Sequence, residues 1–240
     1  TRFLGLGTGF LITCLIQSSS ATTVMVVSFV NAGLLSLTES IGVIMGANIG
    51  TTVTAWLVSL FGFKFKIAHF ALPILAVGFP MIFSNKNKLK SWGEFIIGFA
   101  LLFMGLDALK SAVPDIKNNP EAVAFIAEFA NMGFLSTLLF VLIGTILTVV
   151  VQSSSAAMAI TLVLCNQGVI PLDVAAAIVL GENVGTTITA NLAAAVANIH
   201  AKRAAMAHLI FNVFGVVIRI STPSKISDFN KSICCFSSHP

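Results

Sequence analysis

The sequence predicts an all-α polytopic membrane protein that contains two copies of one repeat. Hydrophobic residues make up 57% of the 240 positions and charged residues only 9%, whereas an average soluble domain has roughly 25% charged residues. Residues 3–38, 40–63 and 129–172 contain no Asp, Glu, Lys or Arg. Uncharged apolar runs longer than about 18 residues are typical of helices inside a bilayer. The repeat has a constant offset of 135 residues.

The apolar stretches 3–38 and 132–170 are each too long for one straight crossing. As a single helix, residues 3–38 would be about 54 Å long, whereas the hydrocarbon core of a bilayer is about 30 Å thick. The polar residues Gln17–Ser20 and Gln152–Ser155 lie near the middle of these two stretches. We therefore predict a re-entrant hairpin or a broken helix in each stretch, with its polar turn well inside the bilayer.

The remaining elements follow in order along the chain. We predict apolar helices at 40–63, 67–83, 95–109, 174–199 and 204–220, and a solvated loop at the lysine-rich residues 84–93. Apolar residues at helical spacing between 110 and 131 predict a short amphipathic helix at the interface, or one packed on the bundle. The expected division is a first repeat core at 1–66, connecting helices and linker at 67–131, a second repeat core at 132–203, a terminal transmembrane helix at 204–220 and a polar tail at 221–240.

Two polar motifs return in register in the second repeat. Residues 9–57 align with 144–192 without a gap, and 18 of the 49 positions are identical. Chance similarity between apolar segments would match Leu with Val, but it would not reproduce polar motifs at one offset. The first motif is Gln17-Ser18-Ser19-Ser20, which returns as Gln152-Ser153-Ser154-Ser155; the second is Gly46-x-Asn48-x-Gly50-Thr51-Thr52, which returns as Gly181-x-Asn183-x-Gly185-Thr186-Thr187.

The relative direction of the repeats depends on how many segments cross between them. If the hairpins re-enter without crossing, three segments separate the repeats and the second repeat is inverted. Inverted repeats with discontinuous helices are a recurrent plan of secondary transporters. If residues 22–38 cross on their own, the number becomes four and the repeats run parallel. The sequence leaves both arrangements open.

The polar motifs have the chemistry of an ion-binding site. A helix break inside a bilayer frees backbone N–H and C=O groups that must line a cavity or bind something. N–H groups at a helix start attract anions, and carbonyl and hydroxyl oxygens suit a hard cation such as sodium. The alternative is that the motifs only pack helices, with Ser and Thr bonding back to their own helix. Recurrence of both motifs favours binding.

Fourteen polar residues of the two motifs are the candidate ligands of substrate and ions. They are Gln17, Ser18, Ser19, Ser20, Asn48, Thr51 and Thr52 in the first repeat, and Gln152, Ser153, Ser154, Ser155, Asn183, Thr186 and Thr187 in the second. Glu182 is a further candidate because it replaces Ala47 of the first copy, and ionisable residues inside a bilayer are costly and usually functional. It would coordinate a cation or carry a proton; the alternative is a carboxylate at the membrane edge that faces water.

Other classes of function find little support in the sequence. The Gly-x-Ser-x-Gly turn of serine hydrolases is absent, so we expect no enzymatic activity and no organic cofactor. The four cysteines do not form a metal-binding pattern. Basic residues fall in expected connectors, such as Lys86–Lys90 and Lys202-Arg203, where they set orientation in the membrane rather than bind nucleic acid.

The two motifs resemble those of the type II sodium/phosphate cotransporter family. Ala207-His208-x-x-Phe211-Asn212 is also similar to a segment of that family after the second repeat. The resemblance covers roughly residues 5–220. It implies sodium-coupled import of inorganic phosphate across the cell membrane, the inner membrane in bacteria. It also implies that Na⁺ is the coupling ion and that the Gln-Ser-Ser-Ser regions form the phosphate and sodium sites between inverted repeats.

Three departures from the family pattern leave alternatives. Ala68-His69 is followed by Phe70-Ala71 and lacks the Phe-Asn pair, Glu182 stands where the family more often has a small residue, and residues 221–240 are unmatched. Bacterial members often have a further helix at the start and a PhoU-like regulatory domain at the end. The expected partners are therefore such a domain or a second copy. The alternative functions are a truncated, non-transporting phosphate sensor or subunit, and a transporter of another oxyanion.

Overall fold

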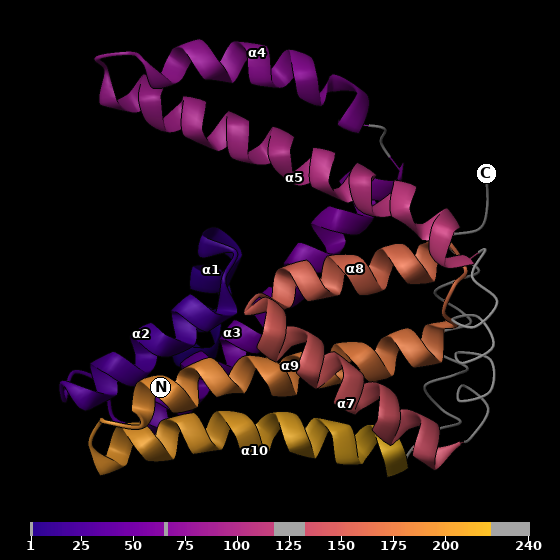
Figure 1. Cartoon of the computed structure of the whole chain (residues 1–240). Coiled ribbons are helices and arrows are strands. Elements are labelled where there is room, and N and C mark those ends of the chain that lie inside the picture. The colour runs from indigo at the N-terminus through magenta and orange to yellow at the C-terminus, as the bar shows by residue number, and fades with distance from the viewer. Residues whose placement is uncertain (1, 65–66, 118–132, 222–240) are drawn as a thin grey trace.

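The computed structural model describes residues 2–64, 67–117 and 133–221, and all the regular structure in these ranges is helical (Figure 1). The first repeat contains α1 (Arg2–Ile16), α2 (Ser19–Asn31), α3 (Leu37–Leu57) and the π-helix η1 (Val58–Lys64). The connecting region contains the 3₁₀ helix η2 (Ile67–Phe70), α4 (Ala71–Ile82) and α5 (Asn87–Lys117). The second repeat contains α7 (Phe134–Val151), α8 (Ser154–Asn166) and α9 (Leu172–Ala194), and α10 (Ile199–Ser221) follows it.

The long apolar stretches are broken at the predicted places. In the first repeat α1 ends at Ile16 and α2 begins at Ser19, so Gln17 and Ser18 form the break. In the second, Gln152 and Ser153 separate α7 from α8. Each short helix ends before a glycine with positive φ, Gly33 at 74° and Gly168 at 70°, a conformation that glycine adopts without steric cost. The prediction of a broken helix in each repeat is therefore confirmed, and the equivalent breaks lie 135 residues apart.

Glycines let the first and third helices of each repeat pack backbone to backbone. A Cβ atom on Gly46 would lie 2.0 Å from the carbonyl oxygen of Leu6, and one on Gly181 would lie 2.0 Å from that of Val141. Gly9 and Gly144 face α3 and α9 with the same closeness. Of the two uses that glycine has in such motifs, unusual backbone angles and close helix approach, the structure selects close approach, since Gly46 and Gly181 lie inside regular helices.

Small apolar residues join the two repeats at the centre of the bundle. Val26, Val27 and Val30 of α2 and Ile44 of α3 pack in one buried cluster with alanines of α9 and α10. A second buried cluster joins α7 and α9 through Phe140, Val141 and Ile178, together with Val216 of α10. The helix α10 therefore lies against both repeats, and it holds α2 and α3 next to α9.

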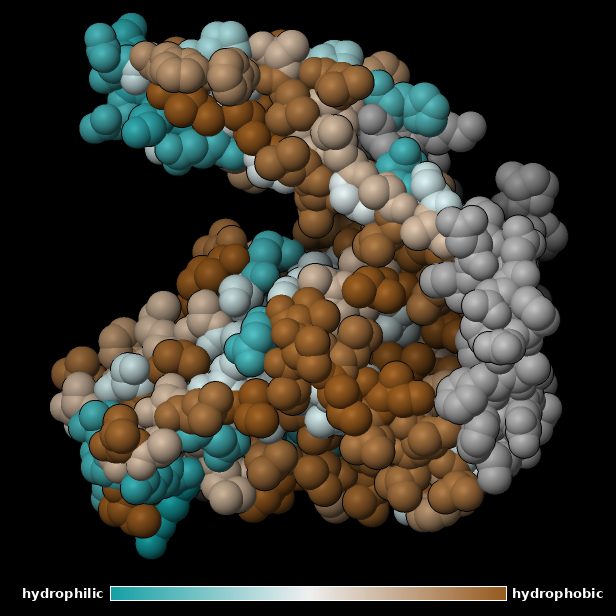
Figure 2. Space-filling model, viewed as in Figure 1, coloured by the Kyte–Doolittle hydropathy of each residue, from teal (hydrophilic) through white to brown (hydrophobic). Residues whose placement is uncertain are grey.

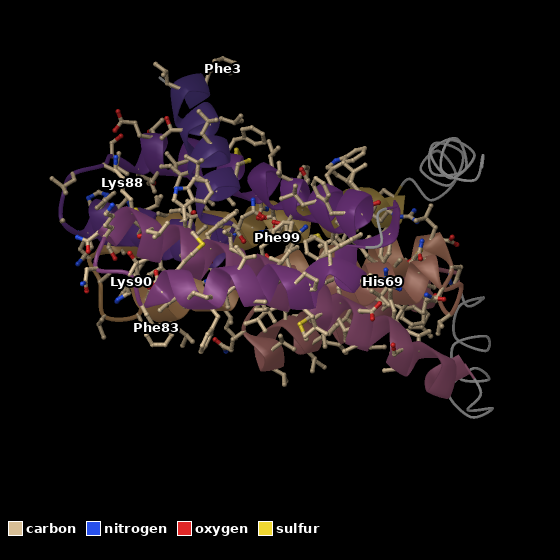
Figure 3. All side chains as sticks on the ribbon, turned by 90° about the horizontal axis from the view of Figure 1, so that it is seen from above. Phe3, His69, Phe83, Lys88, Lys90 and Phe99 are labelled. Atoms are coloured by element: carbon tan, nitrogen blue, oxygen red, sulfur yellow. The ribbon has the colours of Figure 1, made fainter. Side chains whose placement is uncertain are left out.

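The pair α4–α5 extends away from this bundle (Figure 1). Its contact with the rest of the chain is a buried cluster of Val58 of η1, Phe103 and Leu106 of α5 and Val163 of α8. Lys110 adds a hydrogen bond from its ammonium group to the Gly62 carbonyl. Figure 3 shows Lys88 and Lys90 at one end of the α4–α5 pair and His69 at the other.

Two predictions about the connectors are wrong. The expected loop 84–93 is helical from Asn87 onward, so Lys88 and Lys90 lie in the first turn of α5. Lys202 and Arg203 lie in α10, which begins at Ile199 and not at residue 204. In both places the helix begins earlier than expected and includes the basic residues. Lysine and arginine have a high helix propensity, which permits this. The predicted amphipathic helix around Ala122–Phe129 and the polar tail from 222 onward lie outside the described residues.

Apolar side chains cover most of the outer surface, as expected for a protein in lipid. Figure 2 shows hydrophobic residues over most of the visible face, whereas hydrophilic residues gather where α4 meets α5 and where α10 begins. Four described helical segments are long and apolar enough to cross a membrane, judged by length and composition: Leu37–Phe63, Asn87–Val113, Phe134–Val151 and Ile199–Ser221. The expected crossing at 67–83 is not among them, because α4 has 12 residues and spans only about 18 Å.

Candidate functional site

The first polar turn has a backbone that few residues adopt in regular structure. Gln17 has a φ of 56°, in the left-handed region, and Ser18 is extended with φ −143° and ψ 102°. The Ser18 hydroxyl oxygen accepts a hydrogen bond from the backbone N–H of Ala21 at 3.2 Å, so Ser18 caps α2. The Gln17 side chain turns back and donates to the Cys14 carbonyl at 2.7 Å, which satisfies one carbonyl at the end of α1.

The second turn repeats this geometry residue by residue. Gln152 has a φ of 59° and Ser153 has φ −144° and ψ 106°. The Ser153 hydroxyl accepts from the N–H of Ala156 at 3.2 Å, and the Gln152 side chain donates to the Val149 carbonyl at 3.0 Å. Two turns that share an uncommon backbone and the same side-chain bonds show that the motif specifies a local structure.

Each turn presents backbone N–H groups that precede the first bond of its helix. The first intrahelical bond of α2 runs from Thr22 N–H to the Ser18 carbonyl at 3.1 Å, and that of α8 from Ala157 N–H to the Ser153 carbonyl at 3.0 Å. The backbone N–H groups of the second and third serine of each motif therefore have no acceptor within their own helix. Ser19 and Ser154 are also buried, each with 5% of its side chain exposed. Such N–H groups, with the positive end of the helix dipole, form an anion site.

The two turns differ in how they are attached to the neighbouring long helix. Thr54 of α3 donates its hydroxyl hydrogen to the side-chain oxygen of Gln17 at 2.9 Å. Its equivalent in α9, Thr189, donates to the carbonyl of Thr186 in its own helix, and Gln152 is exposed. The first Gln-Ser-Ser-Ser turn is therefore hydrogen-bonded to α3 of its repeat, whereas the hydrogen bonds of Gln152 and Ser153 described here stay within α7 and α8.

The side chains of the second motif have separate roles. The Asn48 amide donates to the side-chain oxygen of Asn212 in α10 at 2.6 Å, which links the first repeat to α10. The threonine hydroxyls donate back to carbonyls of their own helices: Thr51 to Ala47, Thr52 to Ile49, Thr186 to Glu182 and Thr187 to Val184. Thr52 is exposed and Thr187 is buried, while Asn183 is half-buried.

Glu182 lies inside the helix bundle. None of its side chain is exposed, which excludes the interpretation that it faces water. Its Oε1 accepts a hydrogen bond from the Thr161 hydroxyl of α8 at 2.7 Å. Its Oε2 is buried and has no hydrogen-bond partner.

Several polar residues of the interior did not come from the two motifs. Thr13 of α1 donates to Thr22 of α2 at 3.2 Å, and Thr161 meets Glu182 in the second repeat. Thr13 and Thr54 could have been identified from the repeat alignment, since both return at the offset of 135. Asn212 could have been identified from the family resemblance. Thr22 and Thr161 could not have been identified from the alignment, because their equivalents are Ala157 and Val26.

In the first repeat the structure joins the Gln-Ser-Ser-Ser turn to the helix that contains the second motif, but it does not bond the two turns to each other. Among the described residues, no hydrogen bond connects Gln17–Ser20 with Gln152–Ser155. In the same part of the chain no three His, Cys, Asp or Glu side chains gather in a way that could hold a metal ion. Within the described residues, the buried polar groups are hydroxyls, amides, helix ends, the Glu182 carboxylate, the His208 imidazole and the Arg219 guanidinium.

Comparison with known proteins identifies a family and several relatives of the chain. The Na⁺/Pi-cotransporter family matches residues 1–111 and 125–238, so the expectation that the resemblance ends near residue 220 and leaves the tail unmatched is wrong. The "Uncharacterized protein YqeW" of Bacillus subtilis is 34% identical over 86% of this chain and 64% of its own length. The "Putative inorganic phosphate export protein YjbB" of Escherichia coli is 30% identical over 88% of this chain and 37% of its own length.

A shorter segment is similar to a mammalian protein. The sheep sodium-dependent phosphate transport protein 2A is 54% identical over 56 residues, which are 23% of this chain and 9% of that protein. No solved structure matches the chain significantly. The match over most of the sequence, together with the two Gln-Ser-Ser-Ser turns, shows that the chain belongs to the Na⁺/Pi-cotransporter family.

Proposed function

We propose that the chain forms the membrane core of a sodium-coupled secondary transporter that imports inorganic phosphate across a cell membrane. The observation that carries this proposal is the pair of helix breaks at Gln17-Ser18 and Gln152-Ser153, which share one backbone conformation and lie 135 residues apart. The relatives named for phosphate transport support phosphate as the substrate. A second oxyanion, such as sulfate, has the same tetrahedral shape and is the alternative that a competition assay distinguishes.

At each break, opposite helix ends supply opposite partial charges. The N-terminus of α2 offers the N–H groups of Ser19 and Ser20, and that of α8 offers those of Ser154 and Ser155, so both suit phosphate oxygens. The C-terminal carbonyls of α1 and α7, with nearby serine and threonine oxygens, suit Na⁺. An anion and a cation bound side by side each lower the cost of removing the other from water.

Helix directions support an inverted relation between the repeats. The contacts of Gly5, Gly9 and Gly50 run in the same order along α1 and α3, so these helices are parallel. The helix α2 folds back against both, and α10 runs opposite to α2, because Val26–Val30 pack on Ala201–Ala205 while Asn31 bonds Asn198. The helix α9 precedes α10 and packs antiparallel to it, so α9 runs opposite to α3. This is the arrangement that lets one repeat move against the other in alternating access.

Import follows from the sodium gradient, which points into most cells and would carry phosphate with it. The bacterial relative YjbB is named for export, so direction requires its own measurement. Purified protein in proteoliposomes is expected to accumulate labelled phosphate when Na⁺ is outside and to lose this activity when choline replaces Na⁺. Uptake that does not depend on Na⁺ would contradict the coupling. Phosphate binding without flux would favour the sensor or subunit.

Substitution of Ser19 and Ser154, the first residues of α2 and α8, gives the most direct test of the proposed phosphate site. Ser19→Ala and Ser154→Ala each remove a buried hydroxyl beside the proposed phosphate site, and a hydrogen bond to a charged group contributes about 1.5–3 kcal/mol. The KM for phosphate is therefore expected to rise about 10- to 150-fold. The matched control is Ser28→Ala, since Ser28 lies on the exposed side of α2 and bonds only the Val24 carbonyl. Equal KM values in all three variants would contradict the proposed site.

A further inference from the structure

The two repeats differ at one buried pair of positions. In the second repeat the Thr161 hydroxyl donates to Oε1 of Glu182 at 2.7 Å. The equivalent positions of the first repeat are Val26 and Ala47, which are 4% and 0% exposed. The same place in the fold therefore accepts an apolar pair. The carboxylate and its hydroxyl partner are not needed to fill it, and burial of a carboxylate is costly.

A second difference leaves another buried oxygen without a partner in the second repeat, on a residue that faces α9 three positions after Glu182. In the first repeat Thr13 donates to Thr22. Its equivalent, Thr148, is 3% exposed, and its hydroxyl has no partner, because Ala157 replaces Thr22. The Cβ of Thr148 lies 2.9 Å from where a Cβ on Gly185 would be, so Thr148 faces the turn of α9 that begins near Glu182.

The helices α7 and α8 supply no charged side chain to neutralise Glu182, and the buried cation of α10, Arg219, lies beyond Val216 along that helix. The segments α7 and α8 that flank it contain no Asp, Glu, Lys or Arg. Val216 of α10 and Ile178 of α9 belong to one buried cluster. Because we infer that α10 packs antiparallel to α9, Asn212, one turn before Val216, comes to about the level of Glu182, one turn after Ile178, and His208 follows one turn further. The two ring nitrogens of His208 are buried without partners, as is Oε2 of Glu182, so these groups are not bonded to each other.

We propose that Glu182, Thr148 and Thr161 form a sodium site that exists only in the second repeat. One Na⁺ ion would neutralise the single negative charge of the Glu182 carboxylate. Hydroxyl and carboxylate oxygens are also the ligands that a hard cation prefers. The two unpartnered oxygens, Thr148 Oγ1 and Glu182 Oε2, are then satisfied by the ion. The site rests on the proposed sodium coupling, and it adds an ion whose binding is separate from the two Gln-Ser-Ser-Ser turns.

Sodium binding in the absence of phosphate tests this site apart from transport. Thermal unfolding of the purified chain in detergent is followed in NaCl and in choline chloride at equal ionic strength, because a bound ion raises the unfolding temperature. We expect stabilisation by NaCl, and we expect Glu182→Gln to raise the half-stabilising Na⁺ concentration at least tenfold. Thr161→Val with Glu182→Ala should do the same and should fold, since it copies the Val26 and Ala47 pair of the first repeat.

Glu39→Gln is the matched control for loss of one negative charge. Glu39 is exposed at the start of α3, where it forms a capping box with Ser36, and glutamine also serves in that position. Its sodium response should equal that of the original chain. A chain that responds to pH but not to Na⁺ would overturn the proposal in favour of a proton, and an unchanged sodium response in folded Glu182 variants would overturn it as well. Proteoliposomes without phosphate flux would instead count against the proposed function alone.

Discussion

At the scale of the residue, the side-chain hydrogen bonds of Gln17 and Gln152, and of the serines that follow them, explain why the motif begins with glutamine and continues with serine. A left-handed residue ends one helix, and an extended serine whose hydroxyl caps the next helix begins another. The glutamine amide also bonds a carbonyl of the helix that it ends. One short motif thus stops a helix, starts the next and satisfies the polar groups that lipid would leave without partners.

The bond between Thr54 and Gln17 leads to a test with a control built into the repeat. Thr54→Val removes the donor to Oε1 of Gln17, and a neutral hydrogen bond contributes about 0.5–1.5 kcal/mol. We expect the KM for phosphate to rise about 2- to 12-fold. Thr189→Val removes only a bond within α9 and should change KM less. Phosphate uptake at saturating Na⁺ gives the KM of both variants. Equal increases in KM would show that the hydrogen bond from Thr54 to Gln17 does not contribute to phosphate binding.

At the scale of the element, the sequence predicted the helix breaks because two polar motifs interrupted runs too long for one crossing. The recurring glycines were compatible with unusual backbone angles or with close helix approach, and only the structure selects close approach. The sequence did not indicate where α5 and α10 begin, since lysine and arginine are compatible with both a connector and a helix turn. Nor did it indicate Thr161 as the partner of Glu182. That contact joins residues on different helices, and only packing brings them together.

The glycines of the second motif should be the most sensitive positions to added volume. A Cβ on Gly46 or Gly181 would overlap a backbone carbonyl of the facing helix, and a backbone cannot move aside as a side chain can. Gly46→Ala and Gly181→Ala are expected to destabilise the fold by about 1–3 kcal/mol or more. Gly105→Ala in α5 meets open space and should be neutral or slightly stabilising. Thermal unfolding in detergent compares the three, and equal unfolding temperatures would contradict the close packing.

At the scale of the whole molecule, α10 decides how the repeats are joined. It contributes alanines to the cluster with α2 and α9, its Asn212 accepts the bond from Asn48, and Asn198 near its start bonds Asn31 at the end of α2. The helix α4 follows the first repeat as α10 follows the second. If α4 had the same role as α10, it would pack against the second repeat. The structure instead pairs α4 with α5, so the two halves are alike in their cores and differ in the helix that follows each core.

The proposed inverted arrangement makes a prediction about exposed positions at the start of α3 and α9. Thr38 and Asp173 are equivalent at the repeat offset, and both are exposed. Because we propose that α3 and α9 run in opposite directions, their first turns should lie on opposite sides of the membrane. Thr38→Cys and Asp173→Cys are made separately in a chain whose four native cysteines are replaced by serine or alanine.

A membrane-impermeant maleimide is then applied to intact cells and to inverted vesicles. It should label one variant only from outside and the other only from inside, with labelling after detergent as the measure of total thiol. Labelling of both variants from the same side would show that the repeats run parallel, the alternative in which residues 22–38 cross on their own. That result would remove the symmetry on which alternating access rests, while the two helix breaks and their serines would keep their chemistry. The experiment therefore separates the arrangement of the repeats from the nature of the binding site.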